Sequence, residues 1–140
     1  MGFTNPTDGA VASILRDTRT IAVIGAGTDR FKPVYGVMSF LIAHGYDVYP
    51  VNPTLAGEVV QGKTILADMG EIAVPIDMVD CFRRPEFIPP VVDRAIEVGA
   101  RSVWMQLCVI NEEAAAKARA AGLLVVMDRC PVIEWSRLGL

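Results

Sequence analysis

The sequence lacks long apolar runs, basic clusters and a signal for export. Its 140 residues contain no stretch of about 18 consecutive apolar residues, so no transmembrane helix is predicted. The 13 lysines and arginines are outnumbered by 16 acidic residues and form no block. Because nucleic acids are bound by clustered cations, a nucleic-acid partner is disfavoured. The N-terminal residues show no basic segment followed by an apolar core, so no secretory signal is expected.

Cysteine and histidine are also scarce. Cys81, Cys108 and Cys130 are odd in number and widely spaced, which predicts neither a disulfide framework nor a metal knuckle. Free thiols fit a reducing compartment, so a cytoplasmic location is expected. The only histidine, His44, stands at the end of a predicted helix, where a structural role is expected. We therefore predict no metal site and no catalytic residue.

Apolar, strand-like segments alternate with helix-like segments along the whole chain, which is 52% hydrophobic. The predicted strands are 21–24, 48–51, 76–82, 102–107 and 123–127, with a short strand at 64–66. The predicted helices are 11–16, 35–44, 88–98, 112–121 and 133–137, with a helical turn at 67–71. Asp8 is expected to cap the first helix and Asn111 the fourth. This alternation predicts one domain, residues 1–140, of doubly wound α/β class with a five-stranded, mostly parallel sheet.

In such a sheet, ligands bind at the carboxyl ends of the strands. The first strand ends in a glycine-rich turn, which consists of Gly25, Ala26, Gly27 and Thr28. Glycines let the backbone approach a phosphate closely, and the following helix can aim its N–H groups at it. Arg30 and Lys32 flank the turn and suit several phosphate charges. The alternatives are a tight turn without a ligand and two solvated loop charges.

The turn does not meet the NAD fingerprint. The third glycine position of that fingerprint is occupied by Arg30. The acid that would hold a ribose hydroxyl after the second strand is absent, and Asn52 and Pro53 stand there instead. The turn therefore suits a nucleotide diphosphate but not NAD bound in the usual manner.

The third strand ends in Phe82, Arg83 and Arg84. An aromatic ring beside two guanidinium groups can stack on a base and pair with a phosphate. The alternatives are core packing for Phe82 and surface ion pairs for the arginines.

The fifth strand is followed by Asp128, Arg129 and Cys130. Cys130 is either a reactive thiol activated by Arg129 or an inert, half-buried cysteine. Asp128 and Glu134 form either a carboxylate pair, a cap for the last helix, or ion pairs with Arg129.

Several motifs appear together in an order and spacing that resemble a known family. The run VIGAGTDRFKPVYGVMSFLIAHGYDVYPVNP is followed by FRRPE, W-x-Q-L and MDRC. From about Thr20 to Glu134 the chain resembles the small CoA-binding proteins with a Rossmann-like fold. It is also similar to the CoA-binding N-terminal domain of the succinyl-CoA synthetase α subunit. The resemblance does not extend to the second domain, which carries the phosphohistidine in that enzyme, so ligase activity is not expected.

The resemblance implies coenzyme A or an acyl-CoA as the ligand. It implies a diphosphate over residues 25–28 and the next helix start, with Arg30 and Lys32 nearby. The adenine would lie between Asn52-Pro53 and Phe82-Arg83. The pantetheine arm would run towards Gln106, Leu107 and Cys108, or towards Cys130.

The sequence departs from the family pattern at one helix start. Many members carry serine there, whereas this chain has Lys32-Pro33-Val34-Tyr35. Tyr35 or Thr28 would then supply the hydroxyl contact.

Three functions follow from these observations. The first is non-catalytic binding of coenzyme A or acyl-CoA. The second is a CoA-dependent enzyme subunit or a thiol-active protein that uses Cys130. The third is a sensor of an NAD-type nucleotide, against which the missing acid counts. The sequence identifies no protein partner.

Overall fold

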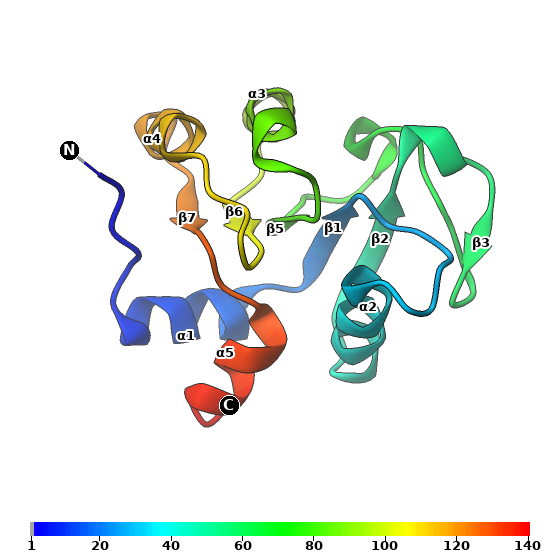
Figure 1. The fold of residues 1–140 in the computed structure, drawn as a ribbon, viewed down its shortest axis with the longest axis horizontal. Helices are drawn as coiled ribbons and strands as arrows, with labels where there is room; N and C mark the ends of the chain where they lie inside the picture. The colour runs from blue at the N-terminus through cyan, green and yellow to red at the C-terminus, as the bar shows by residue number, and fades with distance from the viewer. Residues whose placement is uncertain (1) are drawn as a thin grey trace.

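The central sheet is formed by the five apolar segments that the sequence marks as its main strands. The computed structural model describes residues 2–140. The sheet has the strand order β2-β1-β5-β6-β7, and all neighbouring strands are parallel (Figure 1). Its strands are β1 (Thr20–Ile24), β2 (Asp47–Val51), β5 (Met78–Cys81), β6 (Ser102–Met105) and β7 (Leu124–Val126). β1, β5 and β6 are buried along their whole length, which explains why they contain few polar residues.

Five α-helices cover the two faces of the sheet. They are α1 (Asp8–Asp17), α2 (Pro33–Ala43), α3 (Ile88–Glu97), α4 (Glu112–Ala120) and α5 (Pro131–Arg137). Helices α3 and α4 lie on one face, and α1, α2 and α5 lie on the other (Figure 1). Each layer encloses its own hydrophobic cluster against the sheet. The predicted doubly wound α/β class is therefore confirmed.

The predicted capping residue is observed at α4 but not at α1. The Asn111 side chain accepts a hydrogen bond from the backbone N–H of Ala114 at 3.0 Å, as predicted. The predicted cap of α1 is wrong, because Thr7 occupies the capping position and its hydroxyl accepts from Ala10 N–H at 3.2 Å. Asp8 instead begins the helix and pairs with Arg137 of α5 at 2.8 Å.

A small hairpin lies between β2 and β5 in the chain, and only its second strand overlaps a predicted strand. It consists of β3 (Val59–Val60) and β4 (Lys63–Thr64), which pair antiparallel around a turn at Gln61 and Gly62, both with positive φ. The predicted strand 64–66 is present only as β4 and a single bridge from Leu66 to β2. Three short 3-10 helices, η1 (Pro53–Leu55), η2 (Met69–Glu71) and η3 (Pro85–Phe87), complete the connections.

The strand order places the ligand-binding crevice at one point of the sheet. The chain moves outwards from β1 to β2, then returns to the other side of β1 with β5 and continues outwards to β7. The direction reverses between β1 and β5, and their carboxyl ends therefore border an open crevice. Within residues 2–140, no helix is both long and apolar enough to cross a membrane.

Candidate functional site

A pocket of about 420 Å³ lies where the strand order reverses. It is bordered by the first turns of α2 and by the carboxyl ends of β1, β5 and β6. Its walls are formed by Gly25, Lys32, Pro33, Val34, Val37, Phe82, Gln106, Leu107, Val109 and Cys130. Five of the predicted site residues thus share one pocket, although they come from four separate segments of the chain.

The two glycines after β1 have different physical roles. Gly25 has a φ of +88°, and a Cβ there would lie 2.3 Å from the carbonyl oxygen of Phe82. The fold itself therefore requires glycine at position 25. At Gly27 the φ is not in the left-handed region, and the nearest atom to an added Cβ is Leu55 Cδ1 at 3.9 Å. The packing of the protein does not require this second glycine, which leaves open space beside the backbone.

The Asn52 side chain holds the glycine turn in place. Its amide Nδ2 donates to the carbonyl oxygen of Ala26 at 2.9 Å, and its Oδ1 accepts from Thr54 N–H at 3.0 Å. The backbone N–H groups of Gly25 and Ala26 both donate to the carbonyl oxygen of Val51. The predicted residue Asn52 is thus used within the fold, and Pro53 beside it is exposed.

Helix α2 begins at this crevice without a side-chain cap. Lys32 occupies the capping position and makes no capping hydrogen bond, and Pro33 follows it. Helices α1 and α4 are capped by Thr7 and Asn111, whereas α3 and α5, like α2, have no side-chain cap. The N–H groups in the first turn of α2 therefore lack a capping side chain, and the positive end of the helix dipole faces the crevice.

Four cations stand on the two loops that follow β1 and β5, and Lys32 among them lines the pocket. Arg30, Lys32 and Arg84 are exposed, and Arg83 is half-buried. Among residues 2–140, no ion pair involves any of these four side chains. The Arg83 guanidinium lies 4.8 Å from the centre of the Phe87 ring, a cation–π contact. The surface ion pairs that we considered for Arg83 and Arg84 are therefore not found in the described part of the chain.

Tyr35 and Thr28 are not among the residues that line the pocket, whereas Phe82 is. Phe82 lines it and also packs against the core on the α1, α2 and α5 side, so core packing accounts for part of its burial. Tyr35 is half-buried against the same core. Thr28 is exposed in the loop that precedes α2.

Cys130 lines the pocket with only 9% of its surface exposed. The preceding Arg129 points elsewhere, because its Nε pairs with Glu134 Oε1 at 3.0 Å. Glu134 is 2% exposed and also binds Arg137 Nε through Oε2. The ion pair between Glu134 and Arg129 was one of the predicted alternatives and is confirmed.

Asp128 does not pair with Glu134, and that alternative is wrong. Its Oδ1 accepts a hydrogen bond from the backbone N–H of Cys108 at 2.8 Å. Both residues have left-handed backbone conformations, with φ of 59° for Asp128 and 66° for Cys108. This bond ties the loop after β6 to the loop after β7, so the two loops that border the pocket are held together.

His44 has the structural role that we expected. Its Nδ1 lies 2.8 Å from the carbonyl oxygen of Phe40, and its ring stacks on the Phe40 ring. Trp135 of α5 contacts the imidazole edge-on. Within residues 2–140, no group of three or more His, Cys, Asp or Glu side chains is arranged to hold a metal ion.

One buried group beside the site was not predicted from the sequence. Asp80, on β5, is completely buried, and its Oδ1 accepts a hydrogen bond from Gln106 Nε2 at 2.9 Å. Burial raises the pKa of Asp80 to about 7, against the opposing effect of the Gln106 hydrogen bond. The sequence did contain a signal for this group, because Asp80 is the single carboxylate well inside an otherwise apolar strand. A charged side chain at such a position requires a partner.

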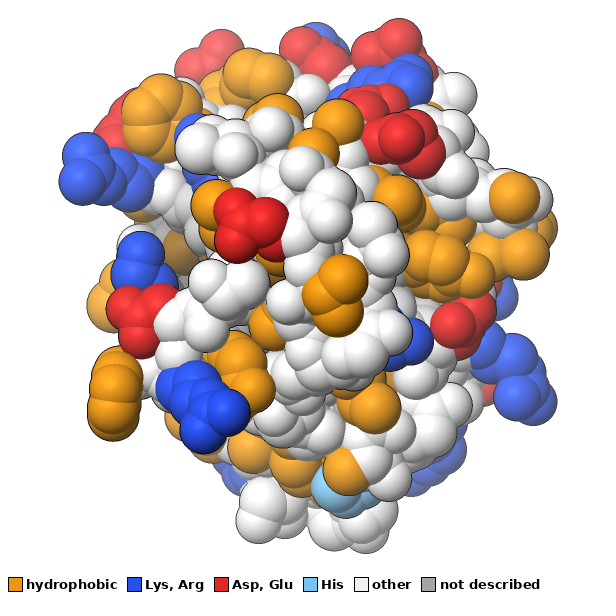
Figure 2. Space-filling view, turned by 90° about the vertical axis from the view of Figure 1, so that its right-hand side faces the viewer, with side chains coloured by type: hydrophobic (Ala, Val, Ile, Leu, Met, Phe, Trp, Pro, Cys, Tyr) orange, Lys and Arg blue, Asp and Glu red, His pale blue; other side chains and the backbone are white. Residues whose placement is uncertain are grey.

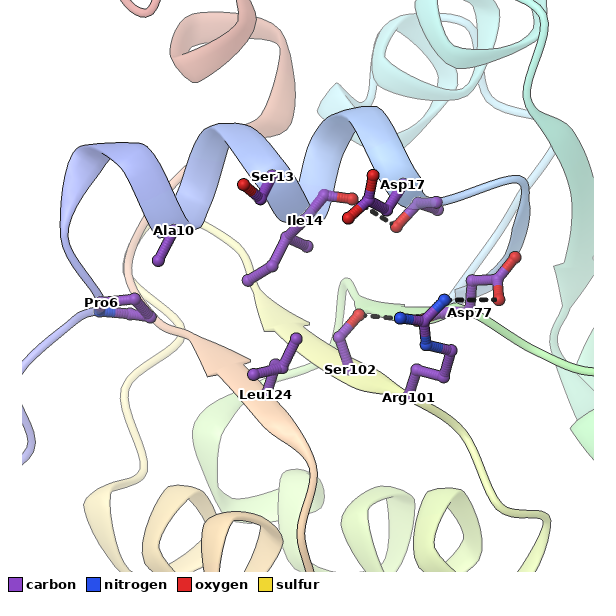
Figure 3. A pocket seen from close by; sticks show the side chains of 10 residues that line it. Pro6, Ala10, Ser13, Ile14, Asp17, Asp77, Arg101, Ser102 and Leu124 are labelled. Atoms are coloured by element: carbon purple, nitrogen blue, oxygen red, sulfur yellow. Dashed lines mark hydrogen bonds and ion pairs between the residues drawn. The ribbon is translucent and has the colours of Figure 1, made fainter.

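A second cavity, of about 320 Å³, lies at the opposite edge of the sheet (Figure 3). It is bordered by α1 and by the amino ends of β6 and β7, with Ile14 and Leu124 facing each other across it. Its polar groups bind one another, since Ser102 Oγ donates to the carbonyl oxygen of Asp77 and Arg101 pairs with the Asp77 carboxylate. None of the predicted site residues lines this cavity.

On the face of the molecule that carries the β3–β4 hairpin and α2, acidic and basic side chains are interspersed (Figure 2). Hydrophobic side chains form one group at the right of this view, and others lie singly or in small groups over the left, the centre and the lower part.

Comparison with known proteins agrees with this geometry. Residues 19–136 match the profile of the CoA binding domain family. The uncharacterized protein YneT of Bacillus subtilis is 33% identical over 126 residues, which cover 90% of this chain and 92% of YneT. The solved structure of a hypothetical protein from Pyrococcus horikoshii is 38% identical, with a TM-score of 0.91 and complete coverage of both chains.

A more distant structure shares only the fold. The dinucleotide forming acetyl-coenzyme A synthetase 1 of Ca. Korarchaeum cryptofilum is 23% identical, with a TM-score of 0.69 over 82% of this chain and 27% of that enzyme. The family profile and the relative from Bacillus subtilis both span most of the sequence, and on that evidence this chain belongs to the CoA binding domain family.

Proposed function

We propose that this protein binds coenzyme A or an acyl-CoA and does not itself catalyse a reaction. The observation that carries the proposal is the presence of four cations on the two loops that follow β1 and β5, none of which has a carboxylate partner among residues 2–140, in a chain whose net charge is −3. Unpaired cations of this kind suit a ligand with several phosphate charges.

The glycine turn and the start of α2 suit the diphosphate. The open space beside Gly27 allows a phosphate to approach the backbone, and the uncapped N-terminus of α2 supplies N–H donors and a favourable dipole. Arg30 and Lys32 extend from the same loop. The adenine is proposed to lie between Pro53 and the Phe82-Arg83 segment, where an aromatic ring and a guanidinium are available.

The adjoining pocket suits the pantetheine arm. Its volume of about 420 Å³ is typical of small-molecule sites, which span roughly 300–1,000 Å³. Val34, Val37, Leu107 and Val109 provide apolar walls for the methyl and methylene groups of the arm. Cytoplasmic binding is proposed because Cys81, Cys108 and Cys130 are all free thiols.

We expect the protein to prefer coenzyme A over both dephospho-CoA and NAD. A diphosphate alone does not use four cations, so the 3′-phosphate is expected to make at least one charge-assisted contact. Such a contact contributes roughly 1.5–3 kcal/mol, and loss of the 3′-phosphate should weaken binding about tenfold or more. Isothermal titration calorimetry with the three ligands measures this preference. Equal affinities for NAD and coenzyme A would contradict the proposal and favour a nucleotide sensor.

A thiol-active protein that uses Cys130 is the second candidate, because this thiol lines the same pocket as Gln106. The Cys130 thiolate would attack one sulfur of CoA disulfide, forming a mixed disulfide and releasing one coenzyme A thiolate. No other oxidant is required. The second candidate function has a variant, in which the site is the CoA-binding part of a larger enzyme.

For this second candidate, treatment with CoA disulfide is expected to add one CoA moiety to Cys130. Intact-mass measurement detects the adduct, and digestion locates it. Cys130→Ser should remove the adduct, whereas Cys108→Ser should leave it, although Cys108 is the more exposed thiol. An adduct on Cys108 alone, or none, would leave Cys130 as a packing residue and favour the plain binding protein.

A further inference from the structure

Asp80 is buried in a way that stability alone does not explain. It lies in the middle of the sheet, in register with Val23 of β1 and Trp104 of β6. None of its surface is exposed, and its Oδ2 has no hydrogen-bond partner among the described residues. Burying a polar atom without a partner is unfavourable, and an apolar side chain at such a position is often at least as stable. Its single polar contact, with Gln106, is therefore the feature to be explained.

Gln106 connects this buried carboxyl to the pocket. It follows β6 directly, is 6% exposed, and lines the pocket together with Gly25 and Cys130. Its Nε2 donates to Asp80 Oδ1 at 2.9 Å, so the amide nitrogen is directed at the sheet. Its carbonyl Oε1 accepts no hydrogen bond from any residue that the structure describes. The oxygen is therefore available to a donor on a bound molecule.

Asp80 prevents the amide from turning over. A flipped Gln106 would place Oε1 against the carboxyl oxygen, where two acceptors would face each other. This preference belongs to the ionised carboxylate, which can only accept; a protonated Asp80 can also donate to Oε1 of a flipped Gln106. The carboxylate thus fixes which end of the Gln106 amide is offered to the pocket.

We propose that Asp80 is a positioning residue that holds Gln106 as a hydrogen-bond acceptor for an amide N–H of the ligand. The proposal rests on the proposed binding of coenzyme A, whose arm contains two secondary amides. A ligand that presents a carboxylate or another acceptor at this point would be disfavoured, because it would meet the Gln106 oxygen.

The test compares two ligands that share a nucleotide. Coenzyme A carries the arm, whereas adenosine 3′,5′-bisphosphate lacks it and keeps both phosphates. Gln106→Leu is expected to weaken coenzyme A binding roughly three- to tenfold, the loss of one neutral hydrogen bond, and to change bisphosphate binding by less than about twofold. Asp80→Val should cause the same selective loss through a misoriented Gln106. Asp80→Asn should retain more coenzyme A binding than Asp80→Val, since its amide keeps a hydrogen bond with Gln106 but, unlike the carboxylate, can also donate to a flipped Oε1.

The calorimetry distinguishes failure of the proposed coenzyme A binding from failure of the proposed positioning role of Asp80. If the wild-type protein binds neither ligand, the proposed function fails, and the role of Asp80 fails with it. If both ligands bind and Gln106→Leu weakens them equally or not at all, the positioning role alone is overturned. Equal effects of Asp80→Asn and Asp80→Val would also overturn it. Should Asp80→Val not fold, the comparison of ligands with Gln106→Leu still decides.

Discussion

Replacing Gly27 with valine is expected to remove measurable coenzyme A binding while leaving a folded protein. An added side chain at this position would occupy the space through which a phosphate approaches the backbone of the turn. A loss of at least about a hundredfold follows if the diphosphate contacts are lost, since each tenfold corresponds to about 1.4 kcal/mol. The fold tolerates the change because position 27 does not use a positive φ, and only Leu55 Cδ1 at 3.9 Å lies near the new Cβ. Calorimetric titration measures the binding, and circular dichroism checks the fold.

Two other glycines provide matched controls for Gly27→Val. Gly9→Val adds the same side chain in α1, where nothing lies within 4 Å of the new Cβ, and should leave binding unchanged. Gly25→Ala should instead destabilise the fold by about 2–4 kcal/mol, because of its positive φ and the clash with the Phe82 carbonyl oxygen. If Gly27→Val is folded and binds coenzyme A normally, the phosphate-binding turn has been placed wrongly.

The fold could be predicted because its strands are mostly apolar. β1, β5 and β6 are buried on both faces, and residues such as Ile21 and Val103 show this directly in the sequence. The β3–β4 hairpin was harder, because two-residue strands show no periodicity. Its turn depends on Gln61 in a left-handed conformation, which few side chains adopt. The cap of α1 was misplaced by one residue, since Thr7 and Asp8 are both good capping residues.

The site was predicted from strand ends, and the structure brings predicted residues that directly follow a strand together in one pocket. Gly25, Phe82 and Gln106 each follow one and line the pocket. Val34 and Val37 also line the pocket but were not among the predicted site residues, because apolar spacing does not distinguish a core face from a pocket wall. Asp80 was missed because its role depends on Gln106, which lies on the neighbouring strand's end and is 26 residues away in sequence.

The stability of the protein is expected to fall as the pH rises from about 4 to about 7 because of Asp80. Burial raises the pKa of this carboxyl to about 7 in the folded state, whereas an unfolded aspartate has a pKa of about 3.9. Between these values the folded state binds the proton more tightly, so the stabilisation is complete below pH 4 and is lost as the pH rises through 7. The total change is on the order of a few kcal/mol. Urea unfolding at pH 5 and at pH 8 measures it.

Asp80→Asn isolates this effect, because asparagine keeps an acceptor for Gln106 and does not ionise. Its free energy of unfolding should change less between pH 5 and pH 8 than that of the wild type, and the variant should be the more stable protein at pH 8. Asp68→Asn is the matched control. The hydrogen bonds from Arg94 lower the pKa of Asp68, so its contribution is present above pH 4 and is lost only in stronger acid. If the free energy of unfolding depends on pH identically in the wild type and in Asp80→Asn, the buried carboxyl stays in one protonation state. Water or a bound ligand would then form a hydrogen bond with Oδ2.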